Sequence, residues 1–87
     1  MADELLKTKI QNALKSGLFR GEDDLVDVSD GVDGHIHVVV VSRKFDGRQM
    51  KEKNDLIWDE LEKRLSAEEW GQVSLTVGAS PEEVKAT

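Results

Sequence analysis

The 87-residue chain contains no cysteine. This absence excludes disulfide bonds, thiolate nucleophiles, Cys-x-x-Cys redox chemistry and cysteine ligands for a metal ion. Because a secreted domain of this size often needs a disulfide, the composition favours a cytoplasmic location. The first residues lack the basic segment and apolar stretch of a secretory signal, and the longest apolar run, Val38–Val41, is far shorter than the roughly 20 residues that span a bilayer.

Catalytic motifs are also missing. The chain has no phosphate-binding glycine loop, and Gly-Ala-Ser-Pro at 78–81 lacks the Gly-x-Ser-x-Gly pattern of a nucleophile elbow. With 38% hydrophobic and 34% charged residues, the chain is globular but short, so we expect one domain over 1–87 with a single thin core. Few residues remain to form the sides of a deep cleft, and we therefore expect no enzymatic activity.

Hydrophobic periodicity predicts six elements in the order α-β-β-α-β-α. The first helix, over 3–16, carries an apolar stripe at helical spacing. The second helix runs from about residue 48 to 65, with Met50, Ile57, Leu61 and Leu65 forming its stripe and Asn54 interrupting it. Ser-Pro-Glu-Glu at 80–83 forms a capping box that begins a last helix of at most two turns.

Three strands are predicted at 25–29, 35–42 and 73–77. In the second strand, Ile36, Val38 and Val40 share one face, and the opposite face takes His35, His37, Val39 and Val41. The first two strands follow each other through Asp-Gly turns and form an antiparallel hairpin, whereas the long helix makes the last two parallel. The fold class is therefore α+β, with a three-stranded mixed sheet.

Charge is distributed unevenly. The net charge is −6, and the segment 22–33 holds six acids and no base. The segment 43–53 has a net charge of +3, because it contains two acids, Asp46 and Glu52, and five bases: Arg43, Lys44, Arg48, Lys51 and Lys53. This patch is the one surface suited to an anionic partner, and it brackets a turn and a helix N-terminus.

The sequence Val-Val-Val-Val-Ser-Arg-Lys-Phe-Asp-Gly-Arg-Gln-Met at 38–50 resembles the BolA family, which has Phe-Glu/Asp-Gly-Lys/Arg between a Val-Val-Ser-like strand end and a helix. Ser-Pro-Glu-Glu-Val at 80–84 is similar to that family's Thr-Pro-Glu-Glu-Trp. The likeness covers nearly the whole chain. It implies a fold like the type II KH domain, with the helices on one face of the sheet.

The resemblance also implies function. BolA-like proteins pair with monothiol glutaredoxins, share a 2Fe–2S cluster with them in iron or stress homeostasis, and some are described as DNA-binding regulators. The family's cluster ligands are a Cys or His in the hairpin loop and a His on the last strand; Val32 and Ser74 stand at those positions here, with His35 near the loop position. Asn54 replaces the His of the helix motif Arg-His-Arg. The resemblance therefore leaves His35 as the candidate metal ligand, with no cofactor bound by the chain alone.

Two rival functions follow for the patch. As a protein-partner surface, Arg43, Lys44, Arg48, Lys51, Lys53 and Asn54 would contact a glutaredoxin-like or cluster-assembly protein. As a nucleic-acid surface, the same residues would contact phosphates in a transcriptional regulator, although no Gly-x-x-Gly loop is present. A third alternative is a metal site built on His35 and His37, completed by Asp30 or Asp33. An EF-hand is excluded, because the twelfth position counted from Asp27 is Val38 rather than a glutamate.

Overall fold

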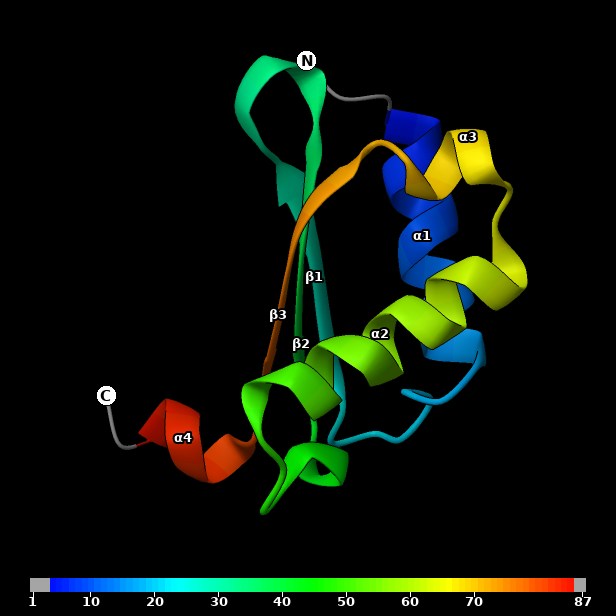
Figure 1. Ribbon diagram of the computed structural model, residues 1–87. Helices are drawn as coiled ribbons and strands as arrows, with labels where there is room; N and C mark the ends of the chain where they lie inside the picture. The colour runs from blue at the N-terminus through cyan, green and yellow to red at the C-terminus, as the bar shows by residue number, and fades with distance from the viewer. Residues whose placement is uncertain (1–3, 86–87) are drawn as a thin grey trace.

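The computed structural model describes residues 4–85 of the chain. Its helices and strands are α1 (Glu4–Ser16), β1 (Leu25–Asp30), β2 (Ile36–Val41), α2 (Met50–Arg64), α3 (Ala67–Trp70), β3 (Val73–Ala79) and α4 (Pro81–Lys85), with single 3₁₀ turns at Val32–Gly34 and Arg43–Phe45 (Figure 1). The six predicted elements are present in the predicted order, and the structure adds the short helix α3 between α2 and β3. Asp3, the predicted first residue of α1, lies outside the described residues. None of the described helices is long and apolar enough to cross a membrane.

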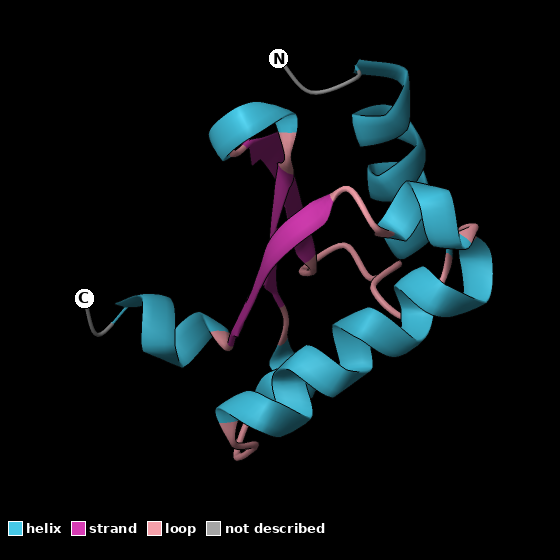
Figure 2. Ribbon diagram, turned by 45° about the horizontal axis from the view of Figure 1, so that its top comes forward, coloured by secondary structure: helices cyan, strands magenta, loops and turns pink. Residues whose placement is uncertain are grey.

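The three strands form one sheet in the order β1-β2-β3. β1 pairs with β2 in antiparallel fashion, with Leu25 opposite Val41, and β2 pairs with β3 in parallel. The predicted mixed sheet is therefore confirmed. In both ribbon views α1, α2 and α3 lie on one side of the sheet, whereas the five-residue α4 points away from the end of β3 (Figures 1 and 2).

The core lies between β2 and the two long helices. Ile36, Val38 and Val40 of β2 are completely buried, as their predicted shared face requires. They pack with apolar side chains of α1 and α2 and with two phenylalanines whose ring centres are 5.5 Å apart: Ile10, Leu14, Ile57, Leu61, Phe19 and Phe45. Burying one such side chain contributes roughly 1.5–3 kcal/mol, so this layer supplies most of the stability of a domain this small.

α3 is an element that the sequence analysis did not predict. Ser66 is its N-cap: the Ser66 hydroxyl accepts a hydrogen bond from the Glu69 amide, while the Glu69 carboxylate accepts one from the Ser66 amide. This helix places Trp70 against Trp58 of α2, with ring centres 6.0 Å apart in an edge-to-face arrangement. Both indoles are half-buried packing residues.

A β-bulge at the start of β3 changes which side chains face the helices. Ile36 is paired with Val73 but His37 is paired with Leu75, so Ser74 is the extra residue. Beyond the bulge Thr76 is buried, whereas Leu75 and Val77 are 47% and 39% exposed. The alternation of Val73, Leu75 and Val77 in the sequence is therefore split between the two faces of the sheet.

Gly78 of β3 lies against Lys53 of α2 and the ring of Phe45. A Cβ atom added at Gly78 would lie 2.9 Å from the Cβ of Lys53 and 3.1 Å from a ring carbon of Phe45. Real Cβ atoms essentially never come within 3.0 Å of another atom, so any larger residue here would force Lys53 to move and would press on the Phe45 ring.

The buried face of α2 differs from the predicted stripe in its first two turns. Met50 is the first helical residue and is 74% exposed, while Lys53 is buried. The buried positions are Lys53, Ile57, Glu60 and Leu61, which follow the i, i+4, i+7, i+8 spacing. The prediction that Met50 belongs to the stripe is wrong, because the polar Lys53 occupies the inner face one turn before Ile57.

Substitution of Gly78 by alanine should lower the free energy of unfolding by about 1–3 kcal/mol, because the methyl group overpacks the contact with Lys53 and Phe45. Urea denaturation followed by circular dichroism measures this change. The matched control is Ser74→Ala on the exposed side of the same strand, which should stay within about 0.5 kcal/mol of the wild type. A Gly78→Ala protein as stable as the wild type would contradict this account of the packing.

Candidate functional site

The segment from Ser42 to Lys53, here called the β2–α2 corner, connects the central strand to the long helix. Ser42 is buried and its hydroxyl accepts a hydrogen bond from the Lys44 amide at 3.1 Å, which begins the 3₁₀ turn. Phe45 anchors the turn in the core, and Gly47 adopts a φ of 73°, a left-handed conformation that favours glycine. The corner that carries the family resemblance is therefore a fixed structure.

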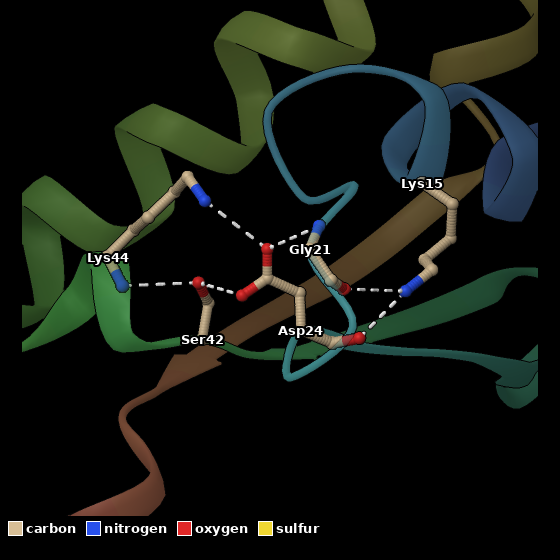
Figure 3. A network of polar contacts seen from close by, with 5 residues as sticks. All are labelled: Lys15, Gly21, Asp24, Ser42 and Lys44. Carbon is tan, nitrogen blue, oxygen red and sulfur yellow. Dashed lines mark hydrogen bonds and ion pairs between the residues drawn. The ribbon is translucent and has the colours of Figure 1, made fainter.

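A polar network ties this corner to the start of β1 (Figure 3). The carboxylate of Asp24 accepts hydrogen bonds from the Ser42 hydroxyl at 2.6 Å, the Gly21 amide at 3.2 Å and the Lys44 ammonium at 3.3 Å. Lys15 of α1 donates to the backbone carbonyls of Gly21 and Asp24. The buried carboxylate of Asp24 therefore joins the turn before β1 to the β2–α2 corner, and Lys15 holds that turn to the end of α1.

The network governs the ionisation of Asp24. Burial by itself would raise the pKa of its carboxyl, but the hydrogen bonds from Ser42, Lys44 and Gly21 outweigh burial and hold the pKa below its ordinary value of 3.8. Asp24 is therefore an anion at neutral pH, and it neutralises part of the charge that Lys44 brings to the corner.

The five predicted bases do not share one environment. Arg43 and Lys51 are exposed. Arg48 is exposed too, and its guanidinium donates to the Lys44 carbonyl at 2.9 Å and lies 3.8 Å from the Glu52 carboxylate. The structure does not place Lys53 on this surface: it is buried, so the patch consists of four bases rather than five.

Lys53 instead joins α2 to α4. Its ammonium donates to the Glu83 carboxylate at 2.5 Å, and the same carboxylate accepts a hydrogen bond from the Ser80 amide at 2.9 Å. The hydrogen bond from Lys53, supported by that from Ser80, lowers the pKa of Glu83 to about 2. The predicted capping box at Ser80 is therefore present, and its glutamate also neutralises a buried cation.

Asn54 lies at the interface between α2 and β3. It is half-buried, and its side-chain carbonyl accepts a hydrogen bond from the Thr76 hydroxyl at 3.2 Å. Asn54, which interrupts the predicted apolar stripe of α2, therefore has a hydrogen-bond partner in Thr76, which the bulge turns toward the helices.

The histidines lie at the other end of β2, away from the corner. His35 is exposed just before β2, and its Nδ1 atom is 3.0 Å from the Val32 carbonyl oxygen. His37 lies over Gly31, where an added Cβ would come within 2.6 Å of its Nε2 atom. Across residues 4–85, no three His, Cys, Asp or Glu side chains gather as a metal site.

These residues can be compared with the ligands that a 2Fe–2S cluster needs. Iron in such clusters is held by thiolate or imidazole groups. Val32 is an exposed hydrocarbon and Ser74 an exposed hydroxyl, so neither supplies a suitable donor. The imidazoles near the hairpin loop are those of His35, just before β2, and His37, over Gly31. The residues present do not make the two-donor site that the resemblance implies.

An open groove of about 480 Å³ lies between α1 and the end of α2. Its two cations, Lys9 and Arg64, are paired with Glu69 and Glu60. None of the predicted site residues lines it. The groove therefore contributes nothing to the corner.

Sequence reasoning missed Asp24 and Ser42 as partners of the patch. They are 18 positions apart, and only the antiparallel register of β1 and β2 brings the residues before Leu25 to the residues after Val41. One local signal was available, since a serine followed by Arg-Lys-Phe suits the start of a helical turn.

Comparison with known proteins identifies the fold. No protein-family model matches the chain, and no curated protein matches its sequence. A Bol-like protein from Babesia bovis matches with a TM-score of 0.64 and 20% identity, over 92% of this chain and 90% of that one. BolA1 from Arabidopsis thaliana matches with a TM-score of 0.61 and 16% identity, over 93% and 98%. The chain therefore has the BolA-like fold, as the resemblance in its sequence predicts.

Replacement of Asp24 by asparagine should lower the free energy of unfolding at pH 7 by about 1–3 kcal/mol, because charge-assisted hydrogen bonds from Ser42 and Lys44 are weakened. The folded-state pKa of Asp24 is depressed, so its contribution is present above about pH 4 and is lost as the pH falls. Urea titrations between pH 7 and pH 2 should therefore show a shallower acid dependence in Asp24→Asn. Asp23→Asn, on the exposed neighbour, is the control; equal slopes for Asp24→Asn and wild type would refute the assignment.

Substitution Lys53→Met should raise the pKa of Glu83 from about 2 toward its ordinary value of 4.5, since the largest cause of its depression is removed. A carbon-13 NMR titration of the side-chain carboxyl measures this directly. Lys51→Met removes an equally charged but exposed residue two positions away and should leave Glu83 unchanged. A Glu83 pKa near 4.5 in the wild-type protein would show that the ion pair does not form in solution.

Proposed function

We propose that the chain is a BolA-like interaction module that binds a protein partner of the monothiol glutaredoxin type, and that it has no catalytic activity of its own. The observation that carries this proposal is the BolA-like fold over more than nine-tenths of the chain, combined with the Phe-Asp-Gly-Arg motif at the β2–α2 corner. Such a module would act in iron or stress homeostasis, inside the cytoplasm.

The β2–α2 corner offers a surface suited to such binding. Arg43, Arg48 and Lys51 are exposed within nine residues of chain, on a molecule that is otherwise strongly acidic. A local cationic patch steers an acidic partner surface and fixes its orientation, while an acidic remainder disfavours other approaches. The network around Asp24 holds the backbone of the corner in one conformation, so little ordering entropy is lost on binding.

Cluster sharing is the finer part of the proposal. His35 is the donor that this chain would supply, and Val32 and Ser74 give no second one. We therefore propose that partner binding depends mainly on the corner rather than on the cluster, so that a glutaredoxin without its cluster also binds.

The test is a titration of the nitrogen-15-labelled chain with a monothiol glutaredoxin, with and without its cluster, followed by amide NMR shifts. We expect shifts at residues 43–51 in both titrations. Arg48→Glu should weaken binding about tenfold, because a charge of the wrong sign then faces the acidic partner. Visible absorption of the mixture reports in parallel whether the cluster is retained.

Lys63→Glu is the matched control, since this lysine is an exposed base at the opposite end of α2. It changes the net charge equally and should bind within twofold of the wild type on the same electrostatic grounds. If both variants lose the same affinity, the effect of Arg48→Glu comes from net charge and not from a contact at the corner. An absence of amide shifts at residues 43–51 would exclude the corner as the interface.

Nucleic-acid binding is the second candidate function. It is favoured by the meeting of exposed Arg43, Arg48 and Lys51 at the N-terminus of α2, where backbone amides also attract anions. Fluorescence anisotropy with duplex and single-stranded DNA distinguishes it from the first. Binding that survives physiological salt and is lost in Arg48→Glu supports this function, and no binding at low salt excludes it.

A further inference from the structure

β3 is an edge strand of the sheet. It is the last strand in the order β1-β2-β3, and no fourth strand from residues 4–85 pairs with its outer side. In both ribbon views it runs along the front of the sheet without another segment covering its length (Figures 1 and 2). Its outer backbone amides and carbonyls are available for pairing with another strand.

The two edges of the sheet differ in how they are protected. β1 carries Asp27 and Asp30, and α1 lies along it, with Lys7 paired to Asp30 at 2.9 Å and Gln11 donating to the Val26 carbonyl. Charges and a covering helix are the usual means by which an edge strand avoids association. β3 carries no charge and no proline in its sequence Val-Ser-Leu-Thr-Val-Gly-Ala. The helix α2 packs on its inner face, and its bulge, which also disfavours edge pairing, is confined to the start of the strand, so the outer edge after Ser74 is without charges of its own.

The uncharged character extends past the strand. Residues 71–81 form the longest stretch of the chain without an acid or a lysine or arginine. Each copy of the chain has a net charge of −6, so two copies repel each other in most orientations. The repulsion is weakest when the uncharged stretch 71–81 of one copy faces the same stretch of the other.

We propose that two copies of the chain associate through antiparallel pairing of their β3 strands, which joins the two sheets into one six-stranded sheet. A two-fold axis perpendicular to the sheet makes such pairing antiparallel and self-complementary. With the axis at Thr76, Leu75, Thr76 and Val77 of the two copies pair regularly, and the bulge at Ser74 lies opposite Gly78 at each end of the contact.

The exposed side chains of β3 suit this arrangement. With the axis at Thr76, Leu75 of one copy lies opposite Val77 of the other, and this pair occurs twice by symmetry. Both side chains are on the face away from the helices, at 47% and 39% exposure. Cross-strand contact would remove apolar surface that the monomer leaves in water.

The size of the contact sets its strength. Seven residues at about 3.3 Å each, on a sheet roughly 10 Å thick, bury on the order of 500 Å² in total. Stable interfaces bury about 1,200 Å² or more, so the dimer is weak and forms at high protein concentration. Because salt screens the repulsion between two acidic copies, added salt strengthens it.

The dissociation constant of so weak a dimer can be measured by sedimentation equilibrium of the full chain at protein concentrations from about 10 μM to about 1 mM. We expect a monomer–dimer equilibrium in which amide NMR shifts change with concentration at residues 73–79. Val77→Lys places two like charges across the axis and should raise the dissociation constant at least about tenfold. Circular dichroism and the urea midpoint verify that the variant is folded.

Leu25→Lys is the matched control, because Leu25 is an exposed leucine on the opposite edge strand β1. It should associate as the wild type does. A protein that stays monomeric at 1 mM overturns the proposal, as does a dimer that Leu25→Lys abolishes and Val77→Lys leaves intact. Leu75→Lys repeats the test at the facing position.

Discussion

The position of β2 between the other two strands is the constraint on which the domain depends. β2 is hydrogen-bonded on both sides, and its inner face of Ile36, Val38 and Val40 is completely buried beneath α1 and α2. A strand with no solvent-exposed edge cannot shift its register by one residue without moving its buried side chains to the wrong face. The hairpin, the crossover helix and the β2–α2 corner are all placed by this one strand.

Much of the fold could be predicted from sequence because its signals are local. The β-branched run of β2, the apolar stripe of α1 and the capping box at Ser80 each concern neighbouring residues, and the structure contains all three. The helix α3 was missed although Ser66 and Glu69 carry a capping box, since four residues give no periodicity. The exposure of Met50 was missed because a buried lysine was not considered at position 53.

The candidate site was harder to predict, because its electrostatics depend on contacts across the fold. The sequence shows five bases in one segment, but not that Lys44 meets Asp24 or that Lys53 meets Glu83. Both acids lie 20 or more positions from their lysine partners, one before β1 and one after β3. The positive surface is consequently smaller than the number of bases indicates, because Lys44 and Lys53 form ion pairs that hold separate segments of the chain together.

The bulge at Ser74 affects how this chain is aligned with its structural relatives. Ser74 was matched to the family's last-strand histidine from the order of apolar and polar residues, yet it is the inserted residue of β3 and has no partner of its own on β2. A gap placed on either side of it moves every later position by one, and with it the assignment of inward and outward side chains. The hydrophobic pattern of this strand therefore does not define which of its residues corresponds to a given residue of a relative. Only the superposed backbones define that correspondence.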